Sequence, residues 1–163
     1  MAPKLSYFNH AILMITGYTP KYKARLYLFF DRVMQEMGYD FIPDSKDLDI
    51  TQVESMYLVP NGCFLLKIIE NEVVGSIGIR VLSTGKAELK RFYVLREYQG
   101  MGIGLNLLKS AIEHTRKTGF SSLRLDTTSN SLRAIKIFQE HGFQKIEKYN
   151  DDPYAELYME LKL

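Results

Sequence analysis

The sequence has little cysteine, little net charge and no long apolar run. Its one cysteine, Cys63, cannot form a disulfide within the chain, which suits a reducing compartment. A formal net charge of +2 produces no strong field, so extensive contact with nucleic acid is not expected. No stretch reaches the roughly 18 apolar residues that cross a bilayer, and residues 1–4 lack the apolar core of a signal peptide. We therefore expect a cytoplasmic protein without a membrane partner.

Metal sites and a second domain are also not expected from the sequence. No His, Cys, Asp and Glu cluster has the spacing of a metal site. Cys63 is isolated in an apolar run, which is typical of a core residue and not of a nucleophile. The chain has 163 residues, of which 46% are hydrophobic, enough for one well-buried core and few for two. We predict a single domain over residues 1–163.

Three glycines at alternate positions are the most informative local feature. Gly100, Gly102 and Gly104 lie between a strand-like run at 88–94 and a helix-like run at 103–117. Glycines let the backbone turn tightly and bring its N–H groups close to an anion. The helix that follows directs its free N–H groups and the positive end of its dipole at the same place. This pattern predicts a phosphate-binding turn, although such a turn can also merely begin a helix.

Two common phosphate-binding loops do not fit this turn. A nucleoside-triphosphate loop needs Lys and then Ser or Thr after its last glycine, whereas Leu105 and Asn106 follow Gly104 here. A dinucleotide-binding fingerprint needs Gly or Ala at position 105 and normally lies near a domain start. The ligand is therefore expected to be a phosphate compound of another class.

The turn resembles the signature of the GNAT acyl-CoA N-acyltransferases: Gln or Arg, two residues, Gly, one residue, then Gly or Ala. Gln99, Gly102 and Gly104 occupy these positions. Upstream, residues 87–94 are similar to the family's fourth strand. Downstream, the family's last helix and exit turn are matched by Asn130, Ala134, Phe138, Gly142 and Phe143. The resemblance covers most of residues 55–163, and the first fifty residues match only in layout.

The resemblance implies a mixed α/β (α+β) fold. Its central sheet would have six to seven mostly antiparallel strands, flanked by about four helices. The hydrophobic patterns predict strands at 10–16, 63–70, 73–82, 87–94, 122–126, 144–148 and 155–161, and helices at 21–37, 103–117 and 131–141. A parallel crossover is expected before 122–126. Residues 39–50, rich in Asp, are predicted to form a loop that acts as a mobile flap.

The resemblance also implies acetyl-CoA as the cosubstrate. In the family, the fourth strand pairs with the pantetheine arm, one backbone N–H binds the thioester oxygen, and the glycine turn holds the pyrophosphate. That oxyanion donor would be the Val94 N–H. The residues expected to bind the cofactor are Phe92, Tyr93, Val94, Gln99, Gly100, Met101, Gly102, Ile103, Gly104, Leu105, Asn130 and Phe138. Asn130 also fits a helix N-cap, which we favour as its main role. The CoA phosphates, or simply solvent, would be met by Arg96, Lys109, Arg133 and Lys136.

Glu88 is the first candidate for a general base. Only a neutral amine attacks a thioester, and a carboxylate on the fourth strand faces the place where the two meet, directly or through a water. Glu88 fits equally well as the partner of a cation on the neighbouring strand. Strand alternation predicts Glu88, Lys90 and Phe92 on one face of the sheet, opposite Arg91 and its alternate neighbours.

Phe138 departs from the family, many members of which carry a tyrosine there that protonates the departing CoA sulfur. A thiolate with a pKa of about 8.5 gains less from protonation than an alkoxide would, so the loss is tolerable. Tyr149 is our candidate for a replacement acid, with Tyr154 and Tyr158 as alternatives. Each tyrosine also fits a packed aromatic of the sheet.

The resulting hypothesis is an N-acetyltransferase that transfers an acetyl group from acetyl-CoA to a primary amine by direct attack. The alternative is a CoA-binding module that has lost catalysis, which the replacement by Phe138 permits. The acceptor is a small molecule or a peptide; the acidic residues between Asp40 and Glu54 suit a cationic one. A homodimer is possible, since many members of the family pair through their C-terminal strands.

Overall fold

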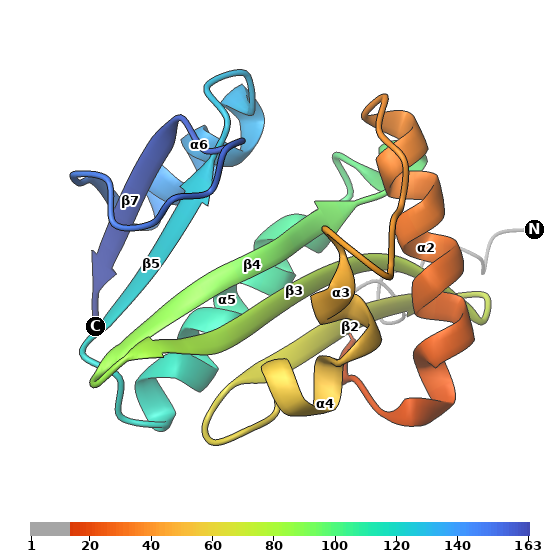
Figure 1. Ribbon diagram of the computed structural model, residues 1–163, viewed down its shortest axis with the longest axis horizontal. Coiled ribbons are helices and arrows are strands. Elements are labelled where there is room, and N and C mark those ends of the chain that lie inside the picture. The colour runs from red at the N-terminus through yellow and green to blue at the C-terminus, as the bar shows by residue number, and fades with distance from the viewer. Residues whose placement is uncertain (1–13) are drawn as a thin grey trace, which may run out of the picture.

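The structure, a computed structural model, describes residues 14–163 and is built on one mixed sheet (Figure 1). The strand order is β1-β2-β3-β4-β5-β7-β6. The strands are β1 (Ile15–Gly17), β2 (Cys63–Ile69), β3 (Glu72–Ser83), β4 (Lys86–Val94), β5 (Ser122–Thr127), β6 (Gln144–Lys145) and β7 (Leu157–Lys162). The helices are α2 (Lys23–Glu36), α3 (Leu48–Thr51), α4 (Val53–Met56), α5 (Ile103–Lys117) and α6 (Leu132–Glu140). Two short 3-10 turns, η1 (Pro20–Tyr22) and η2 (Arg96–Tyr98), precede α2 and the glycine turn.

The sheet topology confirms the predicted arrangement of the strands. β1 to β4 form an antiparallel meander, and β4 then pairs with β5 in parallel across the α5 crossover. β7 pairs antiparallel with both β5 and β6. The single parallel pair follows from the long helical connection, because only a crossover brings the chain back in the same direction.

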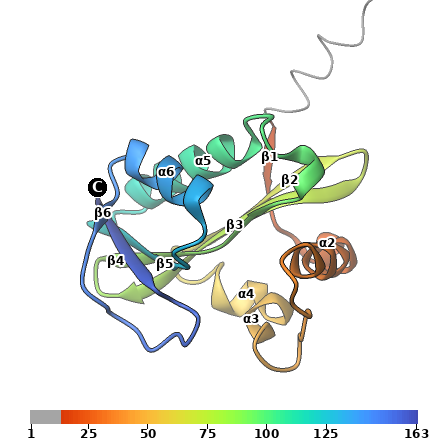
Figure 2. The same cartoon turned by 90° about the horizontal axis from the view of Figure 1, so that it is seen from above.

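Helices cover both faces of the sheet. Figure 2 shows α5 and α6 on one face and α2, α3 and α4 on the other. Each long helix turns an apolar stripe inward at helical spacing. The buried side chains of α2 are Leu26, Phe29, Phe30, Val33 and Met34, and those of α5 include Ile103, Leu107, Leu108, Ala111 and Ile112. The two long predicted helices are thereby confirmed, and the core lies on both sides of β2, β3 and β4.

Several element boundaries differ from the sequence predictions. Most of the predicted strand 10–16 lies outside the described residues, and its end is seen in β1. The predicted strand 144–148 is reduced to two residues, and the next strand begins at Leu157 instead of 155. Between β6 and β7 the chain turns, and a side chain instead of a neighbouring strand accepts a backbone hydrogen bond. The Asn150 side-chain oxygen accepts from the Asp152 N–H at 3.2 Å. The acidic loop at 39–50 ends in one short helix, α3, which begins at Leu48, and α4 follows beyond the loop.

A β-bulge in β4 overturns the predicted alternation of side chains. Lys90 pairs with Gly78, but Tyr93 pairs with Ser76, so β4 carries one extra residue between these pairs. Arg91 is the bulged residue, and its φ of 54° lies in the left-handed region. Arg91 therefore reaches the α3 side of the sheet, which Glu88 and Lys90 also face, whereas Phe92 packs on the opposite face against Phe138 of α6. The alternation holds up to Lys90 and is wrong beyond it.

The burial of Cys63 leads to a testable prediction. The side chain is 7% exposed, and burial raises the pKa of its thiol to about 12. Because the thiolate is the reactive form, we expect native protein at pH 8 to leave a disulfide reagent such as DTNB unreacted for hours. One equivalent should react once the protein is unfolded in guanidinium. Rapid labelling of the native protein would contradict this account of the core.

Candidate active site

The sheet opens between β4 and β5. The two strands pair only at Lys86 to Glu88 with Ser122 to Arg124; within residues 14–163, no ladder joins them beyond that point. Figure 1 shows the strands diverging from there, while β4 stays paired with β3 on its other side. The edge of β4 that faces the opening therefore presents backbone N–H and C=O groups to which an extended ligand can bind as an added strand.

The glycine turn lies at the end of β4. Gly100 and Gly102 both have φ 81°, a conformation that other residues rarely adopt, and Gly102 is the N-cap of α5. A Cβ at Gly104 would lie 3.4 Å from the ring of Phe92, so this glycine allows β4 and α5 to approach closely. The first N–H to bond back along the helix is that of Asn106, to Gly102 O at 3.0 Å. The N–H groups before it are available to an anion.

A cavity of about 510 Å³, here called the first cavity, lies beside the turn. Its walls come from the end of α2, the end of β4, the glycine turn and the start of α6. The predicted cofactor residues that line it are Phe92, Tyr93, Val94, Gln99, Gly100, Gly102, Ile103, Gly104, Leu105 and Asn130. Met101 and Phe138 are not among its lining residues. The structure thus brings most of the predicted set to one place.

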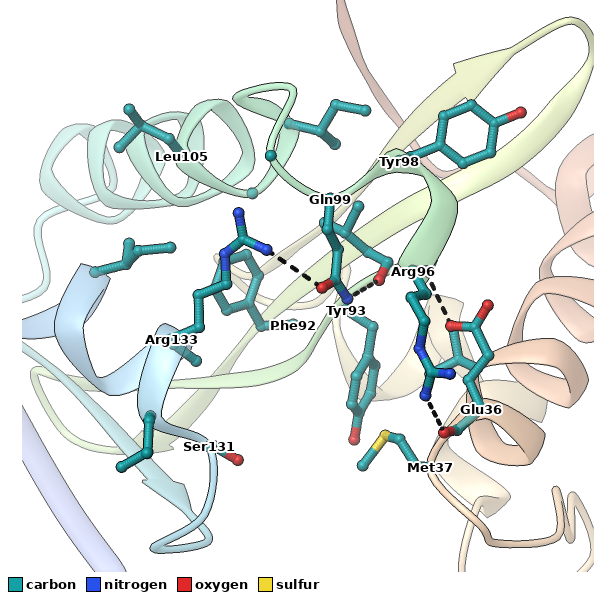
Figure 3. A pocket seen from close by; sticks show the side chains of 18 of the residues that line it. Glu36, Met37, Phe92, Tyr93, Arg96, Tyr98, Gln99, Leu105, Ser131 and Arg133 are labelled. Atoms are coloured by element: carbon teal, nitrogen blue, oxygen red, sulfur yellow. Dashed lines mark hydrogen bonds between the residues drawn. The ribbon is translucent and has the colours of Figure 1, made fainter.

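Two side chains of the first cavity lie across the glycine turn. The Gln99 amide donates to Val94 O at 3.0 Å, which ties the turn to the strand before it. The Arg133 guanidinium approaches the Gln99 Oε1 at 3.5 Å (Figure 3). Of the basic residues predicted near the CoA phosphates, Arg133 and Arg96 line this cavity. Arg96, however, donates to Glu36 O at 2.8 Å, so it joins η2 to α2.

No motif in the sequence marks the residues that α2 and its end contribute to the site. Val33, Glu36 and Met37 line the first cavity, although they lie far before β4, which begins at Lys86. The hydrophobic pattern predicts a helix at 21–37, but only the tertiary fold brings the end of this helix to the end of β4.

A second cavity of about 790 Å³ opens on the α3 side of the sheet. Charged side chains dominate its polar lining, which includes Lys46, Asp47, Asp49, Arg80, Lys90, Arg91, Asp126 and Asp152. Six residues line both cavities, namely Met37, Phe92, Tyr93, Asn130, Ser131 and Ala134. The two cavities therefore meet at the bulged end of β4.

Glu88 is buried and held by a cation. It lies opposite Arg80 in the ladder and is 1% exposed. The Arg80 Nε and one terminal nitrogen each lie 2.8 Å from its Oε2, and Tyr149 donates to its Oε1 at 3.0 Å. Glu88 is a lining residue of neither cavity. The geometry thus matches the alternative of a cross-strand ion pair, and the role as base stays a prediction.

The hydroxyl of Tyr149 is bound to Glu88. Its hydroxyl donates to that carboxylate, and its ring packs edge-on against Tyr158 at 5.5 Å. Burial, followed by the negative charges of Glu88 and Asp126, raises the pKa of Tyr149 well above its usual range. Among the tyrosines considered as acids, Tyr154 is the one that lines the second cavity. The role of Tyr149 as the acid stays a prediction.

Phe138 and Asn130 lie close to the meeting point of the cavities. Phe138 is 3% exposed, and its ring lies 5.6 Å from that of Phe92, so it supports β4 from the α6 side. The predicted helix N-cap at Asn130 is wrong: the N-cap of α6 is Ser131, and no side chain caps this end. The Asn130 Oδ1 instead accepts from the Thr128 hydroxyl, and the residue lines both cavities.

The predicted flap is anchored to β4. Arg91 lies 2.8 Å from Asp47 and donates two hydrogen bonds to Asp49, at 2.5 and 3.0 Å. Tyr57 adds a third hydrogen bond to Asp49. Burial favours the neutral carboxyl of Asp49, but the hydrogen bonds and charge of Arg91 outweigh it and hold its pKa below the usual range. The carboxylate is therefore ionised at neutral pH.

In residues 14–163, no helix combines the length and the apolar character needed to cross a membrane. The same part of the chain holds no group of three or more His, Cys, Asp or Glu side chains that could bind a metal ion.

Known proteins resemble this chain in sequence and fold. Residues 27–143 match the model of the acetyltransferase (GNAT) family. An uncharacterised N-acetyltransferase of Schizosaccharomyces pombe is 30% identical over 133 residues, which are 80% of this chain and 82% of the relative. The chain spans about half the length of several other curated relatives.

Solved structures support the same fold. A GNAT-family acetyltransferase from Staphylococcus aureus Mu50 is 22% identical with a TM-score of 0.82, covering 91% of this chain and 98% of that one. The PaiA N-acetyltransferase from Thermoplasma acidophilum, in complex with coenzyme A, is 20% identical with a TM-score of 0.69, covering 92% and 98%. The glycine turn, the open sheet and the family match lead to one conclusion: the chain belongs to the GNAT acetyltransferase family and is an acyltransferase.

Proposed function

We propose that the protein transfers the acetyl group of acetyl-CoA to a primary amine by direct attack. The observation that carries this proposal is the meeting of two cavities at the bulged end of β4. The first cavity contains the glycine turn and the free edge of β4, which suit the cofactor. The second cavity is lined by carboxylates and hydroxyl groups, which suit an amine acceptor. An amine in the second cavity would approach a thioester lying along β4.

The first cavity offers one kind of contact for each part of acetyl-CoA. The N–H groups of the glycine turn and of the first turn of α5 suit the pyrophosphate, and Arg133 adds a positive charge beside them. The amides of the pantetheine arm suit the unpaired edge of β4 beyond Glu88. The complex of the Thermoplasma enzyme with coenzyme A supports this choice of cofactor.

The reaction needs no covalent enzyme intermediate. The amine nitrogen attacks the thioester carbonyl carbon, and the Val94 N–H is the proposed donor to the oxygen that becomes negative. The C–S bond then breaks, CoA leaves as a thiolate, and the nitrogen loses its proton to a base or to water. Cys63, the single cysteine of the sequence, is buried with a protonated thiol, and so it does not compete as a nucleophile.

We propose that Glu88 accepts this proton through a water, since it does not line either cavity itself. Lys90 and Asp126, which border the second cavity, lie beside it: the Lys90 ammonium is 3.5 Å from Glu88 Oε1 and 2.9 Å from Asp126. Tyr149, whose hydroxyl donates to Oε1 of the same carboxylate, remains the candidate acid.

The substitution Glu88→Gln tests the base. We expect kcat/KM to fall by about 10²-fold at pH 7 and the acidic limb of its pH profile to flatten, because glutamine cannot take a proton. The control is Glu160→Gln, which removes the partner of another partly buried arginine, Arg124, away from both cavities. An unchanged pH profile would leave Glu88 as the partner of Arg80 alone.

The substitution Tyr149→Phe tests the acid. A thiolate leaves with little assistance, so we expect kcat to fall by less than about tenfold. Because the pKa of Tyr149 lies well above its usual range, the hydroxyl stays protonated throughout the assay range, and the readout is the size of the fall in kcat. An unchanged kcat would remove Tyr149 from the reaction.

One observation favours the alternative of a CoA-binding module without catalysis. Phe138 packs between Phe92 and Phe143 and places an apolar ring where many relatives have a hydroxyl. The alternative predicts that acetyl-CoA binds tightly and that no amine releases CoA. Release of CoA with any primary amine, measured as free thiol, would exclude it.

Cofactor binding is tested by calorimetric titration with acetyl-CoA, using NAD and ATP for comparison. We expect selective binding of acetyl-CoA by the wild type and roughly tenfold weaker binding by Gly102→Ala, since a side chain at φ 81° displaces the N–H groups of the turn. The matched control is Gly119→Ala. It has φ 84° and equally open surroundings but lies beyond the far end of α5. Equal loss in both variants, or no selectivity in the wild type, would refute the assignment of the turn.

A further inference from the structure

Arg91 occupies a position that neither strand geometry nor packing requires. In a regular strand its side chain would lie on the α5 face, and only the bulge at φ 54° brings it to the α3 face. A non-glycine residue in this region is strained, so other contacts must hold it there. The Ser76 hydroxyl donates to Arg91 O at 2.7 Å and helps to hold this conformation.

The side chain of Arg91 binds three groups of the opposing segment. It contacts both Asp47 and Asp49, donates to Lys46 O at 3.3 Å, and lies over the ring of Phe30 of α2 at 5.6 Å. Asp47 is 3% exposed and also accepts from the Ile42 N–H at 2.8 Å. Arg91 is therefore bound both to the end of the α2–α3 loop, residues 37–47, and to α3.

The other end of the α2–α3 loop is tied to the same part of β4. Arg96, just after the strand, donates its backbone N–H to the Glu36 carboxylate at 3.0 Å and its guanidinium to Glu36 O at 2.8 Å (Figure 3). Residues 92–95, which include the proposed thioester-binding strand, thus lie between the two arginines. The α2–α3 loop supplies Met37 to both cavities, and Tyr39, Ser45, Lys46 and Asp47 to the second cavity.

We propose that Arg91 is a positioning residue that fixes the acceptor-binding α2–α3 loop relative to the thioester. The inference rests on the proposed function and extends it. Because one side chain joins the loop to the bulge beside Phe92, the wall that binds the amine and the strand that binds the thioester are held as one unit. Arg91 thereby sets the affinity for the acceptor and changes that for acetyl-CoA little, because its own side chain lines the second cavity and not the first.

The test uses Arg91→Lys, Asp49→Asn and the double variant. Lysine keeps the charge but lacks the fork that reaches both Asp47 and Asp49. Hydrogen exchange of the backbone amides of residues 37–49 measures how firmly Arg91 holds the loop, and it needs no acceptor. We expect about tenfold faster exchange in each variant. KM is measured with whichever of four amines the wild type acetylates at the highest rate: putrescine, L-aspartate, kanamycin or a lysine peptide with a blocked N-terminus. We expect KM for the amine to rise about tenfold, with the calorimetric Kd for acetyl-CoA changed less than twofold.

The double variant and a control separate positioning from general destabilisation. If Arg91 acts through Asp49, the double variant should lose no more acceptor affinity than either single variant. The control Arg124→Lys alters a similar arginine, paired with Glu160 at 2.6 Å, that lines neither cavity and lies over the ring of Tyr149; its exchange at 37–49 should equal that of the wild type.

Each contrary result has a distinct meaning. Unchanged exchange at 37–49 in Arg91→Lys would show that Arg91 does not hold the loop, and the inference would be wrong. Faster exchange with an unchanged KM, or an equal loss of acetyl-CoA and acceptor affinity, would also overturn it while the proposed function stands. Failure of the wild type to bind acetyl-CoA would overturn the proposed function and this inference together.

Discussion

The separation of β4 from β5 after Glu88 is the constraint on which the rest of the structure depends. A parallel pair held at only three positions leaves the second half of β4 with one free edge. The glycine turn can serve a ligand only because that edge leads straight into it, and the two cavities can meet only because no strand fills the gap. The bulge at Arg91 acts at the same place, because it decides which side chains face each cavity.

The buried charges on the α3 face form a connected set. Lys90 lies within ion-pairing distance of both Glu88 and Asp126, and Arg80 joins the set through Glu88. Buried pairs contribute little net stability compared with apolar packing, but removal of one partner leaves an unpaired charge and costs about 3–5 kcal/mol. The set is therefore better understood as fixing the polar surface of the second cavity than as holding the fold together.

The sequence predicted features that depend on neighbouring residues. The meander, the crossover and α5 follow from hydrophobic periodicity and turn residues, and Gly102 marks the start of α5 because the turn needs a positive φ. Features set by tertiary contacts were missed or mistaken. Nothing local places Val33 beside β4, and nothing in the strand pattern marks the bulge at Arg91. Asn130 has the composition of an N-cap, but its side chain bonds to Thr128 and the helix begins one residue later.

The wall shared by the two cavities, at Phe92, Tyr93 and Asn130 among others, has a consequence for ligand design. A single molecule that joins a CoA portion to an amine portion would pass from one cavity to the other without crossing the protein. Once its CoA portion is bound, the second portion meets its site at an effective concentration of the order of millimolar. Even an acceptor that binds weakly by itself would then contribute its full contact energy to the conjugate.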